Sequence, residues 1–398
     1  MNDVTCVVIG GGYAGIHAVK AIRKAFSGKS ITRLRLILIE KNPYHFRKVL
    51  LFKLAAKDED ITIPLKYLFP EGIDIIQATV TKIESKEQKL VYQDSAGIKH
   101  TLNYNILILA VGSVVRQPTA ELGGMPLLDS DTAVKIRRTW YANLKRSVME
   151  TDPVERQRLM TIAVVGAGIS GIETSAELAC IVRENAKKVG LDPNNVRICL
   201  LNAHSRLFQE GPPKVGNKLE RLLSSSGVTV LHSHKVLQEK DGKISFFNGK
   251  EMSVGLCIWT LGLLPNPMLW KIGLPLTPEG YVIVDASYRV KGTLGVYSIG
   301  DCAHIMDATT GRPDGKTCKE ASVQAMRLGK IVVSDLKSGK SHSHKGYMDF
   351  FCFGLGPGRG MVWTRLWGLN ILITGKLGWY IRKLTWDYAS LLNRKKTR

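Results

Sequence analysis

Residues 6–15 read CVVIGGGYAG, an apolar strand that runs directly into a G-x-G-x-x-G turn. Gly10 allows the chain to turn sharply out of the strand, Gly12 allows backbone N–H groups to approach a pyrophosphate, and Gly15 allows the next helix to pack on the sheet. A second apolar strand ends at Glu40, where an acidic side chain would bind a ribose diol. The stretch therefore predicts a dinucleotide-binding unit, and the alternative is a helix cap that binds nothing.

The same pattern occurs a second time at residues 162–171, which read IAVVGAGISG. Its glycines Gly166, Gly168 and Gly171 have the same spacing, and an apolar helix pattern follows them. Two such units are a far stronger signal than one, and two dinucleotides in one chain imply electron transfer between them. The next strand of this second unit ends at Asn202, however, and not at an acid.

Composition limits the class of protein. The chain has 398 residues, which exceeds one typical domain, and lysine plus arginine exceed aspartate plus glutamate by 22. We therefore expect an anionic partner, and an anionic membrane surface is favoured over nucleic acid because no basic-aromatic nucleic-acid module stands out. Seven scattered cysteines without a C-x-x-C suit a reducing cytosol. We expect no membrane span, since no run of about 18 uncharged apolar residues occurs.

Three more strand ends fit a fold that binds two dinucleotides. Residues 107–113 and 256–262 are apolar strands that end in small residues. They resemble the A-T-G segments of flavin-dependent reductases, where the chain returns past a cofactor. Gly300 and Asp301 end another strand, which in two-dinucleotide flavoproteins returns to the first domain and hydrogen-bonds the ribityl chain of FAD. The helix expected over 317–336 would begin beside the isoalloxazine.

In this order, the motifs resemble those of the type II NADH:quinone oxidoreductases over almost the whole chain. The resemblance implies an α/β fold with two Rossmann-like dinucleotide-binding domains of the glutathione-reductase type and a C-terminal helical region that associates with a membrane. The expected FAD domain is discontinuous, 1–115 and 285–340. The NAD(P)H domain would be inserted at 116–284, and the C-terminal region would cover 341–398.

The resemblance also implies a set of site residues. The residues expected to bind FAD are Gly10, Gly12, Gly15, Glu40, Lys48, Ala110, Gly112, Gly300 and Asp301. The residues expected to bind NAD(P)H are Gly166, Gly168, Gly171, Glu173, Asn202, Arg206 and Gly262. The residues expected to be catalytic are Glu173, near nicotinamide and flavin, Gln324 and Lys319. The alternative for Glu173 is an acid that stabilises the first turn of its helix through the dipole.

Two departures from the family pattern bear on the substrates. The family usually carries glutamate where Asn202 stands, and an amide does not repel a 2′-phosphate, so either NADH or NADPH fits, with His204 or Arg206 as a phosphate ligand. The quinone segment of the family reads A-Q-x-A-x-Q-Q, whereas residues 318–324 read CKEASVQ. Lys319 is therefore either a site residue or a solvated or lipid-facing charge.

Cys318 lies near the expected flavin and raises the alternative of sulfide:quinone reductase chemistry. That chemistry needs a second cysteine close by to form and reopen a disulfide or persulfide, and Cys302 and Cys352 are the candidates. Neither lies in a motif that resembles that family, so a buried inert thiol is favoured for each cysteine. The nine histidines show no ligand spacing beyond His342-x-His344, and we expect no metal.

The C-terminal region is basic and rich in tryptophan. A helix over Met361 to Asn370 would place Trp363 and Trp367 on one face, and Arg382, Lys383 and Trp386 continue the basic and aromatic pattern. Its basic residues are Lys345, Arg359, Arg365, Lys376, Arg382, Lys383, Arg394, Lys395, Lys396 and Arg398. Such faces are typical of helices that lie in the interface of an anionic membrane. The alternatives are a homodimer interface and a lid over the core.

The sequence thus predicts an FAD-dependent enzyme, without proton pumping, that passes a hydride from NAD(P)H to FAD and two electrons on to a membrane quinone. It would be a peripheral protein on the cytoplasmic side of the cell membrane. The first alternative is a flavin reductase with another acceptor. The second is a redox-sensing flavoprotein without enzymatic activity.

Overall fold

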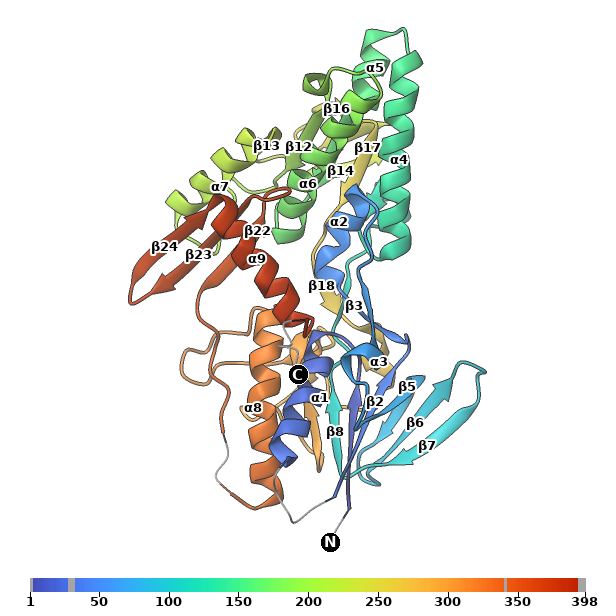
Figure 1. The fold of residues 1–398 in the computed structure, drawn as a ribbon, viewed down its shortest axis with the longest axis vertical. Coiled ribbons are helices and arrows are strands. Elements are labelled where there is room, and N and C mark those ends of the chain that lie inside the picture. Colours follow the sequence, from blue (N-terminus) through green and yellow to red (C-terminus); the bar gives the residue numbers. More distant parts are fainter. Residues whose placement is uncertain (1–2, 28–32, 340–341, 393–398) are drawn as a thin grey trace.

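The structure is a computed structural model that describes residues 3–27, 33–339 and 342–392 (Figure 1). Its first unit is built on a seven-stranded sheet with the order β20-β8-β1-β2-β5-β6-β7. Strand β1 pairs in parallel with both of its neighbours, β2 and β8. Its near-continuous apolar sequence fits a strand that is covered on both faces. The strands are β1 (Val4–Ile9), β2 (Leu34–Glu40), β5 (Asp74–Glu84), β6 (Lys89–Asp94), β7 (Lys99–Asn103), β8 (Ile106–Leu109) and β20 (Val296–Ser298).

Two helices from opposite ends of the chain pack together on the first sheet (Figure 1). They are α1 (Tyr13–Phe26) and α8 (Cys318–Leu336). Gly329 brings their backbones close, because a Cβ added to this residue would lie 2.9 Å from the carbonyl oxygen of Ala21. The start of α8 is thereby held beside the glycine turn that precedes α1.

The second unit repeats the parallel sheet on a smaller scale, with the order β10-β17-β11-β12-β13. Its strands are β10 (Met125–Pro126), β11 (Thr161–Val165), β12 (Arg197–Leu201), β13 (Val228–Leu231) and β17 (Leu256–Trp259). Its helices are α4 (Ser130–Met149), α5 (Pro153–Leu159), α6 (Ile169–Lys188) and α7 (Pro213–Ser225). A three-stranded antiparallel sheet is attached, formed by β14 (Val236–Lys240), β15 (Lys243–Phe246) and β16 (Glu251–Ser253). Two Rossmann-like units are thus present, as predicted.

The chain crosses between the units at an antiparallel pair, β9 (Ser113–Val115) with β18 (Leu263–Pro265). From the first unit, α2 (Leu51–Ala56) reaches up to pack on α4 and α6 (Figure 1). Leu269 and Ile272 lie before the predicted boundary at 284, yet they pack in the core of the first unit. The remaining short elements are β3 (Tyr44–Phe46), β4 (Thr62–Pro64), α3 (Leu65–Leu68), β19 (Val282–Ile283) and β21 (Ala303–His304).

The C-terminal region is a three-stranded antiparallel sheet followed by a helix, and the helix predicted over Met361 to Asn370 is wrong. The elements are β22 (Phe350–Gly354), β23 (Gly360–Leu366), β24 (Leu369–Thr374) and α9 (Gly375–Ala389). Trp367 and Gly368 join β23 to β24 with positive φ values of 48° and 80°, as in the tight turns that connect hairpin strands. Trp363 lies inside β23 and is fully buried, whereas Trp367 lies at the turn and is 91% exposed. The two rings therefore do not share one helix face.

Helix α9 packs inward on this sheet and faces α6 of the second unit through β22 (Figure 1). Arg382 and Trp386, expected on a lipid-facing surface, are buried instead, because α9 turns this side toward the protein core. Arg394, Lys395, Lys396 and Arg398 lie outside the described residues. Within the described ranges, every helix is too short or too polar to cross a membrane.

The two kinds of tryptophan in this region give a stability test. Replacing Trp386 by alanine should lower the free energy of unfolding by about 3–5 kcal/mol, because the ring is 2% exposed and packs beside Phe52 at 5.8 Å. Replacing Trp367 by alanine is the matched control and should change it by less than about 0.5 kcal/mol. Urea unfolding followed by circular dichroism measures both, and equal effects would contradict the inward packing of α9.

Candidate active site

Each nucleotide unit holds a glycine turn of the same geometry at the carboxyl end of its first strand. Gly10 follows β1 with a φ of +106°, and Gly166 follows β11 with a φ of +104°, which side-chain-bearing residues rarely adopt. Gly12 and Gly168 are the N-cap residues of α1 and α6, and the space at their Cβ positions is open. The first N–H groups of both helices can therefore receive an anion.

The third glycine of each motif holds the helix against its own turn. A Cβ added to Gly15 would lie 1.7 Å from the carbonyl oxygen of Gly10, and one added to Gly171 would lie 1.8 Å from that of Gly166. Contacts this short leave room for hydrogen alone at both positions. The sequence-based assignment of helix packing to these two glycines therefore has a direct steric reason.

The returning strands β8 and β17 complete the two cradles. Ala110 and Thr260 each donate their N–H, at 2.9 Å, to the last carbonyl of the central strand beside them. Gly112 and Gly262 then follow with φ values of +65° and +82°, and open space surrounds their Cβ positions. Bare backbone next to a helix N-terminus is suited to a pyrophosphate in each unit, which the sequence predicts to be that of FAD in the first and of NAD(P)H in the second.

The residues that follow the second strand differ between the units. Glu40 ends β2 and accepts hydrogen bonds from the N–H groups of Gly11 at 2.5 Å and Asn42 at 3.1 Å. Asn202 follows β12, is 3% exposed, and uses its amide within the protein. Arg206 donates to backbone carbonyls of its own loop. The Glu40 carboxylate thus binds backbone N–H groups at the glycine turn and just after β2, whereas the Asn202 amide binds groups of its own loop and of His232.

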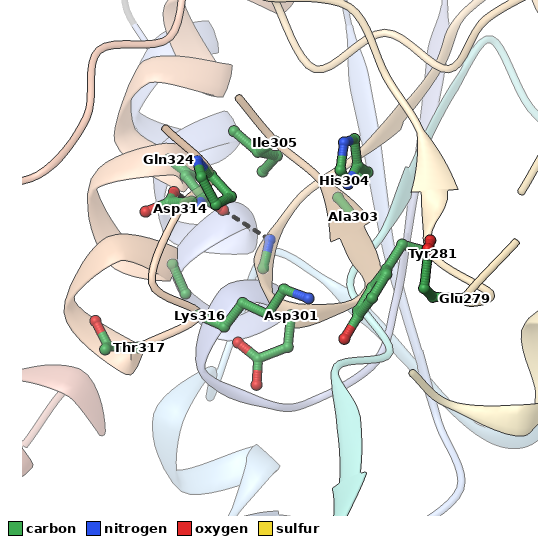
Figure 2. Close-up of a pocket in the computed structure, with 13 residues that line it drawn as sticks. Glu279, Tyr281, Asp301, Ala303, His304, Ile305, Asp314, Lys316, Thr317 and Gln324 are labelled. Atoms are coloured by element: carbon green, nitrogen blue, oxygen red, sulfur yellow. Dashed lines mark hydrogen bonds between the residues drawn. The ribbon is translucent and has the colours of Figure 1, made fainter. Parts of the chain in front are cut away.

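Asp301 lies at the edge of a cavity of about 220 Å³ (Figure 2). Its carboxylate accepts a hydrogen bond from the hydroxyl of Ser113 at 2.7 Å, and burial raises its pKa. Lys48 donates to the carbonyl oxygen of Ser113 at 3.1 Å, and burial lowers the pKa of this lysine. Polar groups from three distant segments therefore meet where the ribityl chain and flavin are expected.

Gln324 holds this corner together from helix α8. Its carbonyl oxygen accepts the N–H of Gly300 at 2.7 Å, the dashed line in Figure 2, and its amide nitrogen donates to Asp314. Because both ends of the amide are engaged and the side chain is buried, it fixes the backbone next to Asp301. The geometry gives Gln324 a positioning part, and its predicted catalytic role remains a prediction.

Lys319 lies in the first turn of α8 and is largely enclosed. Its ammonium group donates to the carbonyl oxygen of Phe350 and lies 4.5 Å from the centre of that ring. The rings of Tyr347 and Phe351 lie 5.9 Å away, and burial lowers the pKa of this lysine. This enclosure favours a site residue over a solvated charge, and the predicted catalytic role of Lys319 remains a prediction.

Glu173 forms a buried ion pair that the sequence did not predict. Its carboxylate oxygens accept two hydrogen bonds from Arg382, at 2.8 and 2.9 Å, and one from the N–H of Gly354 at 2.7 Å. Burial acts to lower the pKa of Arg382, but the Glu173 carboxylate raises it above its usual value. The partners are 209 residues apart, so no local pattern could have identified Arg382.

The cysteines do not support a reactive pair. All seven are free thiols. Burial raises the pKa of Cys302, Cys318 and Cys352, which disfavours the thiolate that exchange chemistry requires. Cys302 and Cys352 are buried and Cys318 is half-buried, so inert thiols are the better interpretation for these three. The prediction of a buried thiol is wrong for Cys180, which is exposed on α6.

Relatives over the whole chain confirm the resemblance that the motifs indicate. The type II NADH:quinone oxidoreductase of Staphylococcus haemolyticus is 25% identical over 396 residues, which covers 95% of this chain and 93% of that protein. That of Staphylococcus aureus is also 25% identical, over 398 residues, with the same coverage of both chains.

Solved structures share the fold. NDH2 of Plasmodium falciparum, solved with NADH, superposes with a TM-score of 0.79 at 16% identity and covers 98% of this chain and 97% of its own. The sulfide:quinone oxidoreductase of Aquifex aeolicus superposes with a TM-score of 0.75 at 18% identity, over 97% of this chain and 90% of its own. At these identities the likeness shows the fold alone.

The family itself follows from the span that holds both cradles. Residues 4–325 match the family described as pyridine nucleotide-disulphide oxidoreductase. This span runs from β1 through both glycine turns to Gln324 in α8, and it covers most of the chain. The chain belongs to the pyridine nucleotide-disulphide oxidoreductase family.

Proposed function

We propose that this protein is an FAD-dependent oxidoreductase that takes a hydride from NAD(P)H and passes two electrons to a quinone. One observation carries the proposal: the segments that leave the two cradles pair directly with each other. Strand β9 begins just after Gly112, β18 begins just after Gly262, and Ser113 pairs with Pro265. If the two cradles bind FAD and NAD(P)H, this pairing supports a close approach of the flavin to the nicotinamide, as hydride transfer between them requires. The relatives with this name support the quinone as acceptor.

FAD, when bound, supplies the centre that accepts a hydride and releases electrons to the acceptor. The residues proposed to hold it are those of the first cradle, with Glu40 at the ribose, and with Lys48, Ser113 and Asp301 at the ribityl and flavin end. The first turn of α8 directs its N–H dipoles into the same region, and Lys319 adds a positive charge there. The N–H dipoles of α8 and the charge of Lys319 would favour a reduced flavin, which carries more negative charge than the oxidised form.

Glu173 and Arg382 are proposed to border the nicotinamide. Glu173 lies in the first turns of α6, directly after the cradle of the second unit. Because Arg382 and the N–H of Gly354 already bind its oxygens, the carboxylate is fixed in one orientation. We infer that it orients the nicotinamide ring and that the C-terminal helix completes this wall.

We propose that α9 and the β23–β24 hairpin form a membrane-binding surface, and that the acceptor reaches the flavin from the membrane at this surface. These elements carry exposed apolar side chains and basic residues on the same part of the chain. The exposed residues are Trp367, Leu369, Ile371, Leu372, Lys376, Leu377, Tyr380 and Lys383. Such a surface fits peripheral attachment to an anionic membrane, on its cytoplasmic side, where a lipid-soluble quinone is available. A homodimer through the same surface is the alternative.

The function is tested by anaerobic stopped-flow measurement of the flavin absorption band. We expect NADH or NADPH to bleach the band and a menaquinone or ubiquinone analogue to restore it within a turnover. Bleaching without reoxidation by either quinone would discard the quinone and favour another acceptor. A flavin that neither nucleotide bleaches would contradict the enzyme assignment and favour a redox sensor.

Replacing Glu173 by glutamine should slow flavin reduction by about tenfold or more, because the nicotinamide loses a fixed charge. It should also lower the free energy of unfolding by about 3–5 kcal/mol, because Arg382 loses its buried partner. The double variant Glu173→Gln with Arg382→Gln should regain much of that stability but not the reduction rate. An unchanged rate in either variant would refute the role of Glu173.

Replacing Trp367 by alanine should weaken binding to vesicles that contain phosphatidylglycerol by about tenfold, because the exposed ring contributes apolar insertion. Flotation of the FAD-loaded protein measures the bound fraction, and phosphatidylcholine vesicles control for charge. If the unaltered protein stays unbound, the membrane proposal fails. If the same variant instead dissociates a dimer in sedimentation velocity, the surface is a homodimer interface.

A further inference from the structure

The loop after β12 is the part of the second unit that would contact the adenosine ribose of its nucleotide. Strand β12 lies next to β11 in the sheet, and β11 leads into the glycine turn at Gly166. In such folds, an acidic side chain at this strand end binds the ribose hydroxyls of NAD and repels the 2′-phosphate of NADP. The first unit has that acid, Glu40, and the second unit has Asn202. The inference that follows rests on the proposed function.

The amide of Asn202 is saturated by groups of the protein. Its nitrogen donates to the carbonyl oxygen of Arg206 at 2.9 Å and bonds Nδ1 of His232 at 3.0 Å. Its oxygen accepts the N–H of His204 at 3.2 Å. These three partners fix the orientation of the amide. Its oxygen already accepts a hydrogen bond from the protein. Asn202 therefore neither binds a diol as Glu40 can nor repels a phosphate.

The neighbouring charged groups determine what this edge can bind. His232 donates from Nε2 to the carboxylate of Glu220 at 3.0 Å. The carboxylate of this neighbouring acid is therefore bound by a protein donor. Arg206 donates from Nη1 and Nη2 to the carbonyl oxygens of Phe208 and Gln209, at 2.7 and 3.0 Å. Its guanidinium holds the loop and places a permanent positive charge beside it.

The loops after β12 and β13 are joined and present polar side chains to solvent. The N–H of Ser233 donates to the carbonyl oxygen of His204 at 3.0 Å, and that of His234 donates to the carbonyl oxygen of Asn202 at 2.9 Å. His204, Ser205 and Lys235 are exposed at this joined edge. An imidazole, a hydroxyl and an ammonium are groups that bind phosphate oxygens.

We propose that NADPH is the preferred hydride donor, and that the joined edge binds its ribose 2′-phosphate, with His204 and Ser205 as ligands. The hydrogen bonds of Asn202 hold the loop that carries these two exposed residues directly after β12. The positive charges of Arg206 and Lys235 add to the attraction for a dianionic phosphate.

The test is calorimetric titration of the FAD-loaded protein with 2′,5′-ADP and with 5′-AMP, two fragments that differ by the 2′-phosphate. We expect 2′,5′-ADP to bind at least about tenfold more tightly, as a charge-assisted phosphate contact provides. Stopped-flow bleaching at limiting nucleotide should be faster with NADPH by a similar factor. Equal affinities of the fragments, or faster bleaching with NADH, would overturn the proposal.

Variants locate the phosphate. His204→Glu puts an acid at an exposed position without altering the Asn202 side chain. It should lower the affinity for 2′,5′-ADP by about tenfold, while the affinity for 5′-AMP stays the same. His342→Glu, at an exposed histidine in another part of the chain, is the matched control and should change neither affinity. Equal losses in both variants would refute the assigned site.

The two proposals fail in distinguishable ways. If NADH bleaches the flavin faster than NADPH and quinone restores it, the oxidoreductase stands and the NADPH preference is wrong. If neither nucleotide bleaches the flavin, the oxidoreductase is wrong, and the two fragments still report directly on the 2′-phosphate site.

Discussion

The structure depends on one steric constraint that occurs twice: the first helix of each nucleotide unit touches the turn that precedes it. At Gly15 and Gly171 the available space holds a hydrogen atom and excludes a methyl group. This contact brings the helix N-terminus to the carboxyl end of the sheet, where the first, second and returning strands of each unit end. The anion sites, the acid at Glu40 and the returning glycines all derive their positions from it.

The buried pair of Glu173 and Arg382 connects the C-terminal elements to this frame. Taking two charges out of water is costly, and the pair returns that energy only with good geometry and further hydrogen bonds. Both conditions are met, because the contacts are bidentate and Gly354 adds a third donor. The carboxylate that we propose to lie beside the nicotinamide is thereby held rigid by an element that lies outside both Rossmann-like units.

Much of the fold could be predicted because its signals are local. Both glycine motifs, the buried strands around them and the helix after Thr317 follow from neighbouring residues. The i, i+4 spacing of Trp363 and Trp367 predicts a helix, but Trp367 and Gly368 form the turn of a hairpin, with positive φ at both residues. Arg382 looked like a surface cation because its partner lies far away in the sequence. The internal hydrogen bonds of Asn202 also required the neighbouring strand β13.

The order of elements along the chain has a consequence for synthesis on the ribosome. The first sheet needs β20, which the ribosome makes only after the whole second unit, and Glu173 needs Arg382, which follows 209 residues later. At typical rates of translation, that interval lasts about 10–40 s. During this time the nascent chain exposes an unpaired acid and an unfinished sheet edge. Each Rossmann-like unit therefore waits during synthesis for a segment that follows the second unit, β20 for the first and α9 for the second.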